Sequence, residues 1–113
     1  MAEWKELTTV TEWEKVWEQS AEQPVLVLKH STQCPISANA FKESEAYLQN
    51  NPRDDVNYVL VKVIESRDVS NKIAADTGVK HESPQLLFVQ NKQATWNASH
   101  WDITKKAVSE ALS

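Results

Sequence analysis

The stretch that decides the fold covers residues 24–37 and reads Pro24-Val25-Leu26-Val27-Leu28-Lys29-His30-Ser31-Thr32-Gln33-Cys34-Pro35-Ile36-Ser37. Its first half is a short apolar run rich in β-branched residues, which is typical of a strand buried on both faces. Its second half places the only cysteine of the chain, Cys34, directly before Pro35. Proline suits the first position of a helix, and a thiol that begins a helix lies near the positive end of the helix dipole, which favours thiolate. We therefore expect a buried strand, a loop with a reactive cysteine, and a helix.

The composition narrows the classes of protein and of partner. The chain has 113 residues and a formal net charge of −4, from 16 acidic and 12 basic residues. This length suits one domain, which we expect over residues 1–113. The charges form no Lys/Arg cluster of the kind that neutralises phosphates, so neither nucleic acid nor membrane is an expected partner. Because no apolar run approaches the ~20 residues that span a bilayer, and residues 1–5 do not resemble the start of a signal peptide, we expect a cytoplasmic protein.

The pattern of apolar residues predicts the remaining helices and strands. Thr11 followed by Glu14 has the form of a capping box, and Trp13 and Trp17 share one side of the helix that follows, where we expect them to pack in the core. Gly78 is well placed to end another helix. The predicted helices cover residues 11–20, 35–49, 70–77 and 104–112, and the predicted strands cover 56–63, 84–90 and 93–96, with a turn at 91–92 and a further edge strand over 4–9.

The order of these elements predicts an α/β fold. Strands separated by helices early in the chain imply right-handed crossovers and parallel pairing, whereas the late hairpin adds antiparallel strands at one edge. A mixed parallel and antiparallel sheet with helices on both faces follows. This order, with a cysteine after the first central strand and Ser83-Pro84 at the start of the third, resembles the thioredoxin fold, a three-layer sandwich.

Within that superfamily, the segment from Lys29 to Ser31 followed by Cys-Pro-Ile-Ser at residues 34–37 is similar to the monothiol bacilliredoxin family. The resemblance implies removal of bacillithiol from mixed disulfides on cytoplasmic client proteins, with Cys34 as the catalytic nucleophile. It implies no tightly bound cofactor, bacillithiol as a thiol co-substrate, and the bacillithiolated clients as partners. Ser37 stands where a dithiol thioredoxin has its second cysteine, which excludes an internal disulfide. An external thiol or a thiol reductase must therefore regenerate Cys34.

Four further residues are candidates for substrate binding. The N–H of Ser37, and its hydroxyl, point back at the sulfur in one interpretation; in the other, Ser37 is an ordinary first-turn serine that satisfies its own helix. Pro35 stiffens the turn and removes one donor that would stabilise the thiolate. The resemblance implies a cis peptide bond between Ser83 and Pro84. The backbone of Ser83 would then pair with the disulfide-bearing segment of a client, as a strand pairs with its neighbour.

Three basic side chains near the loop have two interpretations each. Lys29 and His30 would favour the thiolate or bind the carboxylates of bacillithiol, or else Lys29 is simply solvated and His30 is packed. His81 would approach the site or be an exposed loop histidine. For Trp96 and Trp101 we favour packing over a ligand surface. The lone cysteine and scattered histidines form no recognisable metal site.

Two other functions compete with this prediction. A monothiol glutaredoxin of the iron–sulfur carrier kind holds a cluster between two chains through one cysteine each and an external thiol, but such proteins favour Cys-Gly-Phe-Ser, from which Pro35-Ile36 departs. The other alternative is a non-catalytic thioredoxin-like interaction module in which Cys34 is a small buried hydrophobic residue. The accessibility of Cys34 separates this last alternative from the first two functions.

Overall fold

The computed structural model describes residues 3–50 and 52–113, so residues 1, 2 and 51 lie outside the account that follows. Five strands form one sheet in the order β1-β3-β2-β4-β5. The strands are β1 (Lys5–Glu6), β2 (Val25–His30), β3 (Asn57–Lys62), β4 (Gln85–Gln90) and β5 (Gln93–Ser99).

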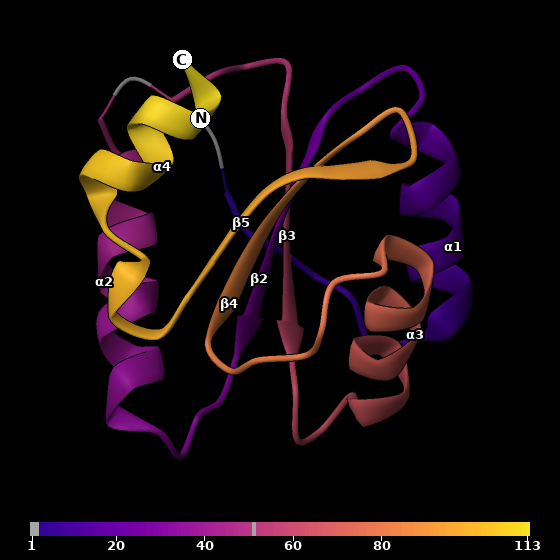
Figure 1. Cartoon of the computed structure of the whole chain (residues 1–113), viewed down its shortest axis with the longest axis horizontal. Coiled ribbons are helices and arrows are strands. Elements are labelled where there is room, and N and C mark those ends of the chain that lie inside the picture. The colour runs from indigo at the N-terminus through magenta and orange to yellow at the C-terminus, as the bar shows by residue number, and fades with distance from the viewer. Residues whose placement is uncertain (1–2, 51) are drawn as a thin grey trace.

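The strand directions confirm the mixed sheet. β1 and β2 both run parallel to β3, whereas β4 runs antiparallel to β2, and β5 runs antiparallel to β4. Because of these directions, the C-terminal ends of β2 and β3 lie at the same end of the sheet as the start of β4. The loop after β2 and the segment before β4 therefore lie at the same end of the molecule, which is the lower end in Figure 1.

The helices cover the two faces of the sheet. In Figure 1, α2 (Pro35–Leu48) and α4 (Lys105–Leu112) lie on one side, and α1 (Val10–Gln19) and α3 (Arg67–Thr77) lie on the other. A short 3-10 helix, η1 (His100–Asp102), connects β5 to α4. The result is the predicted α/β three-layer arrangement. None of the helices in the described part of the chain is long and apolar enough to cross a membrane.

Alternating side chains of β2 enter the two cores. Leu26 and Leu28 pack in the core beneath α2 and α4, and Val25 and Val27 pack in the core beneath α1 and α3. All four side chains are at most 1% exposed. This burial on both faces confirms the prediction for the central strand and explains why its sequence lacks the alternation of an edge strand.

The start of α1 differs from the prediction. Thr9, not Thr11, caps the helix: its hydroxyl accepts from the N–H of Glu12 at 3.1 Å, and the Glu12 carboxylate accepts from the N–H of Thr9 at 3.1 Å. The same carboxylate also accepts from the N–H of Thr8 at 3.0 Å. One acid thus satisfies two N–H groups ahead of the helix, which moves its start toward the N-terminus and leaves Thr11 exposed on the first turn.

Other boundaries shift by a few residues. α3 begins at Arg67 instead of residue 70, and β5 continues to Ser99 instead of ending at residue 96. β1, the edge strand expected over 4–9, has only two residues. Gly78 ends α3 as predicted, with the left-handed φ of 72° that favours glycine.

The tryptophans divide into packed and exposed side chains. Trp13 is fully buried and donates from its indole N–H to Asp76 on α3 at 2.8 Å, and Trp17 packs beside it. Trp96 packs against the core beneath α2 and α4. The packing expected for Trp101 is wrong, because this side chain is 62% exposed. Trp101 lies in η1, a single turn on the surface.

Candidate active site

Cys34 is the N-cap residue of α2. Its backbone is extended, with φ of −116° and ψ of 123°, and Pro35 takes the first helical position as the sequence predicts. The Cys34 side chain is half-buried, and its carbonyl accepts the first helical hydrogen bond, from the N–H of Ala38 at 3.1 Å. The thiol therefore lies at the helix N-terminus with one side open to solvent, unlike a cysteine that fills the core.

Backbone N–H groups of the first turn act on the Cys34 thiol. The N–H of Ser37, followed by that of Ile36, lowers the pKa of Cys34, and the Ser37 hydroxyl adds a smaller effect in the same direction. The side chain makes no capping hydrogen bond of good geometry, so these groups act mainly as nearby dipoles. Pro35 withholds neither of the two main donors, because they belong to the next two residues.

Ser37 is completely buried and braces the loop that precedes it. Its hydroxyl accepts a hydrogen bond from the backbone N–H of Ser31 at 3.3 Å, and the Ser31 hydroxyl accepts from the N–H of Gln33 at 3.4 Å. The N–H of Ser37 meanwhile favours the Cys34 thiolate. Ser37 thus fits neither of the two simple interpretations alone, because it acts on the sulfur and also holds the loop.

Ser83 and Pro84 lie at the same end of the sheet as Cys34, because β4 pairs with β2 and places Gln85 opposite Lys29. The Ser83–Pro84 peptide bond is cis, and Pro84 is buried. The Pro84 carbonyl accepts from the N–H of His100 at 3.0 Å. Within the described residues, the buried Ser83 hydroxyl has no hydrogen-bond partner.

The two basic residues at the end of β2 point to opposite faces of the sheet. Lys29 is fully buried, so the interpretation of a solvated lysine is wrong. Burial lowers the pKa of Lys29 to about 8. His30 packs its ring 5.4 Å from that of Phe41, measured between centroids, as one interpretation predicted. Desolvation is the main cause that lowers the pKa of His30, which leaves its ring neutral at neutral pH and unable to attract a thiolate by charge.

His81 is exposed, yet its Nδ1 atom lies 3.2 Å from the Lys29 amine. Sequence reasoning missed this contact and the buried side chain of Gln85, which donates to the Lys80 carbonyl at 3.0 Å. The sequence did carry a signal that the side chains of Lys29 and Gln85 are buried, because each of them adjoins a run of four apolar residues in its strand.

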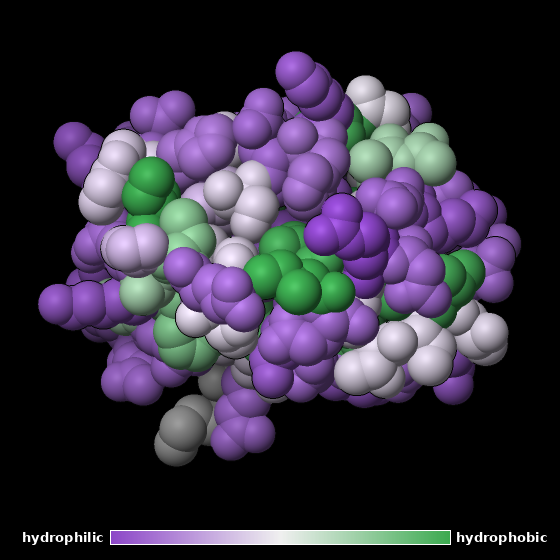
Figure 2. All heavy atoms as spheres, turned by 90° about the horizontal axis from the view of Figure 1, so that it is seen from below, coloured by the Kyte–Doolittle hydropathy of each residue, from purple (hydrophilic) through white to green (hydrophobic). Residues whose placement is uncertain are grey.

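The surface around Cys34 forms the end of the molecule that Figure 2 views face on. Apolar side chains gather near the middle of this face and hydrophilic side chains surround them. Ile64, two residues after the end of β3, is 43% exposed. Among the described residues, no group of three or more His, Cys, Asp and Glu side chains is placed to hold a metal ion.

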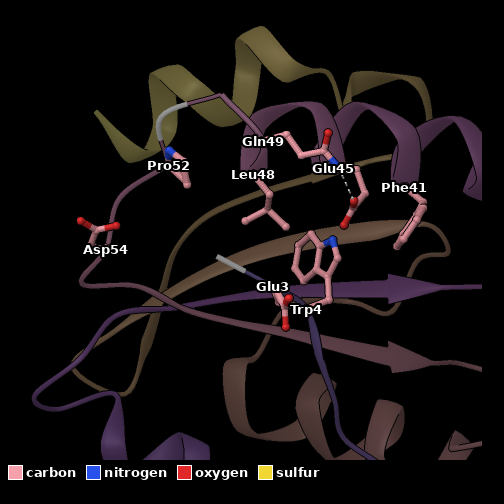
Figure 3. Close-up of a pocket in the computed structure, with 8 residues that line it drawn as sticks. All are labelled: Glu3, Trp4, Phe41, Glu45, Leu48, Gln49, Pro52 and Asp54. Carbon is pink, nitrogen blue, oxygen red and sulfur yellow. Dashed lines mark hydrogen bonds between the residues drawn. The ribbon is translucent and has the colours of Figure 1, made fainter. Parts of the chain in front are cut away.

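A separate groove of about 770 Å³ runs beside α2 and is not lined by Cys34. Figure 3 shows Trp4, Phe41 and Leu48 forming its apolar walls, with Glu45 hydrogen-bonded to Gln49 at 3.3 Å on the helix. The groove therefore lies apart from the thiol.

Comparison with known proteins extends over nearly the whole chain. The sequence profile of the family described as "Monothiol bacilliredoxin BrxC" matches residues 5–108. A solved protein with a thioredoxin fold, to which an oxidoreductase activity is ascribed, is 38% identical with a TM-score of 0.82, over 94% of this chain and 90% of that one. Fasciola hepatica thioredoxin is 17% identical with a TM-score of 0.73, over 96% and 95% of the two chains. Oxidised mitochondrial thioredoxin 3 from Saccharomyces cerevisiae is also 17% identical, with a TM-score of 0.72 over 96% and 92%.

The two thioredoxins are too distant in sequence to show more than the shared fold. The family profile and the 38% identical structure together support a thiol redox role on this thioredoxin-like fold. The one cysteine of the chain is Cys34. The chain belongs to the monothiol bacilliredoxin family.

Proposed function

We propose that this protein removes bacillithiol from mixed disulfides on cytoplasmic client proteins, with Cys34 as its nucleophile. The observation that carries the proposal is the position of Cys34 at the N-terminus of α2, where the N–H groups of Ser37 and Ile36 lower the pKa of a half-buried thiol. A thiolate is the attacking species in thiol–disulfide exchange, and it needs access to the target sulfur. Cys34 meets both conditions.

The first step transfers bacillithiol to the protein. The Cys34 thiolate attacks the bacillithiol sulfur of the client mixed disulfide, a new disulfide forms between Cys34 and bacillithiol, and the client leaves as a thiolate. No electrons are gained or lost in total, because one disulfide replaces another. A modest lowering of the pKa suits this step, since a thiolate that is too stable is a poor nucleophile.

The second step regenerates the protein. Ser37 supplies no thiol, so Cys34 cannot be released by an internal disulfide. A second bacillithiol, as its thiolate, attacks the bacillithiol sulfur of the adduct and leaves as bacillithiol disulfide while Cys34 returns to thiolate. A thiol reductase is the other route of release. Bacillithiol is thus a co-substrate, and the chemistry needs no tightly bound cofactor.

Client binding in this proposal uses the two segments that flank the thiol. Pro35 and Ser37 fix the loop and first turn around Cys34, and Ser83 and Pro84 lie at the same end of the sheet. The backbone of Ser83 pairs with the client segment, as an added strand would. The apolar centre of this face in Figure 2, ringed by hydrophilic side chains, supports contact with a protein rather than with bacillithiol alone.

The test is release of the client thiol. The reduced protein is mixed with a small test protein that carries one bacillithiol mixed disulfide, and the freed client thiol is followed over time. We expect rapid release by the wild type and background release by Cys34→Ser. The same test protein carrying a glutathione mixed disulfide measures selectivity for the thiol. Equal rates for wild type and Cys34→Ser with both substrates would reject Cys34 as the nucleophile.

A further inference from the structure

Two buried polar residues face each other where β2 and β4 approach the active-site end of the sheet. Lys29 pairs with Gln85 in the antiparallel register, next to the pairs Val27 with Leu87 and Val25 with Val89. Lys29 is 0% exposed and Gln85 is 2% exposed. The row of side chains beneath α1 and α3 is thus apolar until its last pair, which is polar on both strands.

The amine of Lys29 lies within hydrogen-bond distance of two groups. It donates to the carbonyl of Ser70 on α3 at 3.2 Å and lies 3.2 Å from Nδ1 of His81. The Ser70 hydroxyl lies 3.3 Å from the same Nδ1 atom. Because a Lys29 ammonium can only donate, Nδ1 of His81 accepts, and the proton of the neutral ring is then on Nε2.

Gln85 holds the same loop from the other strand. Its side-chain amide donates to the backbone carbonyl of Lys80 at 3.0 Å, one residue before His81. The side chains of Lys29 and Gln85 therefore form hydrogen bonds to two neighbouring residues of one loop. This loop, over residues 79–84, joins α3 to β4 and contains Ser83 and Pro84. No other described side chain forms a hydrogen bond to this loop from β2 or β4.

A buried lysine stabilises a core less than an apolar side chain of similar size. An ammonium removed from water destabilises the fold unless it is compensated, and no ion pair of Lys29 exists among the described residues. Burial is the largest cause that lowers the pKa of His81. Among the charged groups around it, Lys29 and Arg67 lower this pKa and Glu82 raises it. A methionine at position 29 would complete the apolar row but would leave Nδ1 of His81 with the Ser70 hydroxyl alone.

We propose that Lys29 is a positioning residue which, through His81 and together with Gln85, holds the loop over residues 79–84 so that Ser83 and Pro84 are set to bind the client. This inference rests on the proposed function. Lys29 acts on client binding and not on the thiol, since Cys34 owes its lowered pKa to the first turn of α2 and to no charge on Lys29. The inference therefore predicts a change in KM that is separate from the reactivity of Cys34.

The test compares matched substitutions. Lys29→Met removes the amine, and Lys80→Met makes the same change at an exposed lysine of the same loop. Two substitutions of His81 distinguish its two ring nitrogens. In His81→Asn the side-chain oxygen takes the position of Nδ1, whereas in His81→Gln the side-chain amide reaches the position of Nε2 instead. Each variant is assayed for KM and kcat with the bacillithiolated test protein, and for the rate at which iodoacetamide alkylates Cys34.

We expect Lys29→Met and His81→Gln to raise KM about tenfold, the effect of losing one part-buried hydrogen bond to a charged group. Lys80→Met and His81→Asn should stay within about twofold of the wild type, and all four variants should alkylate at the wild-type rate. Wild-type KM in both Lys29→Met and His81→Gln would overturn the inference. If Lys29→Met does not fold, the comparison of His81→Gln with His81→Asn decides whether the inference holds. Both of these variants should fold, because the His81 side chain is exposed.

Failure of the proposed function gives a different result. In that case the wild type itself shows no client release, while amide hydrogen exchange still reports on the loop. Faster exchange over residues 79–84 in His81→Gln than in His81→Asn would support the positioning role without any activity. Equal exchange in these two variants would overturn it.

Discussion

The hydroxyl of Ser37 accepts a hydrogen bond from the backbone N–H of Ser31 across the loop that carries Cys34, at a distance of 3.3 Å. Both serines are buried, at 0% and 8% exposure, so this bond is shielded from water. Ser37, which stands where a dithiol thioredoxin has its second cysteine, therefore stabilises the active-site loop of this chain. It fixes the loop that leads to the thiol while its own N–H favours the thiolate.

Ser37→Ala separates these two tasks. The variant leaves the N–H of Ser31 without its partner, and we expect the free energy of unfolding to fall by about 1–3 kcal/mol. The pKa of Cys34 should rise but remain lowered, because the backbone N–H of Ser37, its main cause, is kept. Urea unfolding and the pH dependence of Cys34 alkylation measure the two effects.

The matched control is Ser44→Ala in the same helix. Ser44 is also buried, at 1% exposure, but within the described residues its hydroxyl has no hydrogen-bond partner. Removing that hydroxyl should leave stability unchanged or raise it. Equal losses in Ser37→Ala and Ser44→Ala would show that the bond to Ser31 contributes nothing.

The observed start of α1 gives a second pair of variants. Thr9→Ala removes the hydroxyl cap, which is one half of the capping box with Glu12, and should lower the free energy of unfolding by about 0.5–2 kcal/mol. Thr11→Ala, at the residue that the sequence pattern favoured, should change it by less than about 0.5 kcal/mol because Thr11 is exposed and caps nothing. A larger loss for Thr11→Ala than for Thr9→Ala would contradict the assigned cap.

Burial of Lys29 predicts a specific pH dependence of stability. Its pKa is about 8 in the folded protein against an ordinary value of 10.5, so the unfolded chain holds the proton more tightly. The destabilisation from Lys29 is complete below about pH 8 and disappears as pH rises to about 10.5, with a slope of at most about 1.4 kcal/mol per pH unit. Stability of the wild type relative to Lys29→Met should therefore rise through this window.

Urea unfolding of both proteins at about pH 7.5 and about pH 10 measures this difference, in which the other titrating groups cancel. Lys80→Met serves as the control, because its lysine is exposed and its stability should follow the wild type at both values. A difference between the wild type and Lys29→Met that is the same at both pH values would show that the amine is not desolvated in the fold.

His30→Phe tests whether this histidine is needed as a charge. The pKa of His30 is lowered mainly by desolvation, and its buried Nδ1 atom has no partner among the described residues. A phenylalanine keeps the ring against Phe41 and removes the unsatisfied atom. We expect stability to stay equal or rise by up to about 1 kcal/mol, with an unchanged pKa of Cys34. A clear rise in that pKa on thiol titration would assign His30 an electrostatic role.

The sequence predicts the parts of this fold that depend on local pattern. The apolar run before Lys29 predicts the central strand, Pro35 predicts the first residue of α2, and Gly78 predicts the end of α3, since each depends on neighbours in the chain. The sequence pattern predicts the cap of α1 two residues too late, because Thr9 and Thr11 each precede a glutamate at the same spacing and only the fold shows which threonine caps the helix.

The surroundings of the site depend on long-range contacts. The interpretation of Lys29 as a solvated side chain rests on the usual environment of a lysine at a strand end. Its burial follows from the placement of Ser70 on α3 and His81 in the next loop, which are 41 and 52 residues away in the chain. The hydrogen bond between His100 and Pro84 is likewise a product of the β4–β5 pairing. No local pattern encodes such contacts.

The most direct test of the central claim is the intact mass of the reduced protein after incubation with a bacillithiolated test protein, with Cys34→Ala as the control. We predict one bacillithiol adduct on the wild type, none on Cys34→Ala, and loss of the adduct when excess bacillithiol is added. A wild-type protein that remains unmodified, although iodoacetamide alkylates its Cys34 in the folded state, would contradict the account.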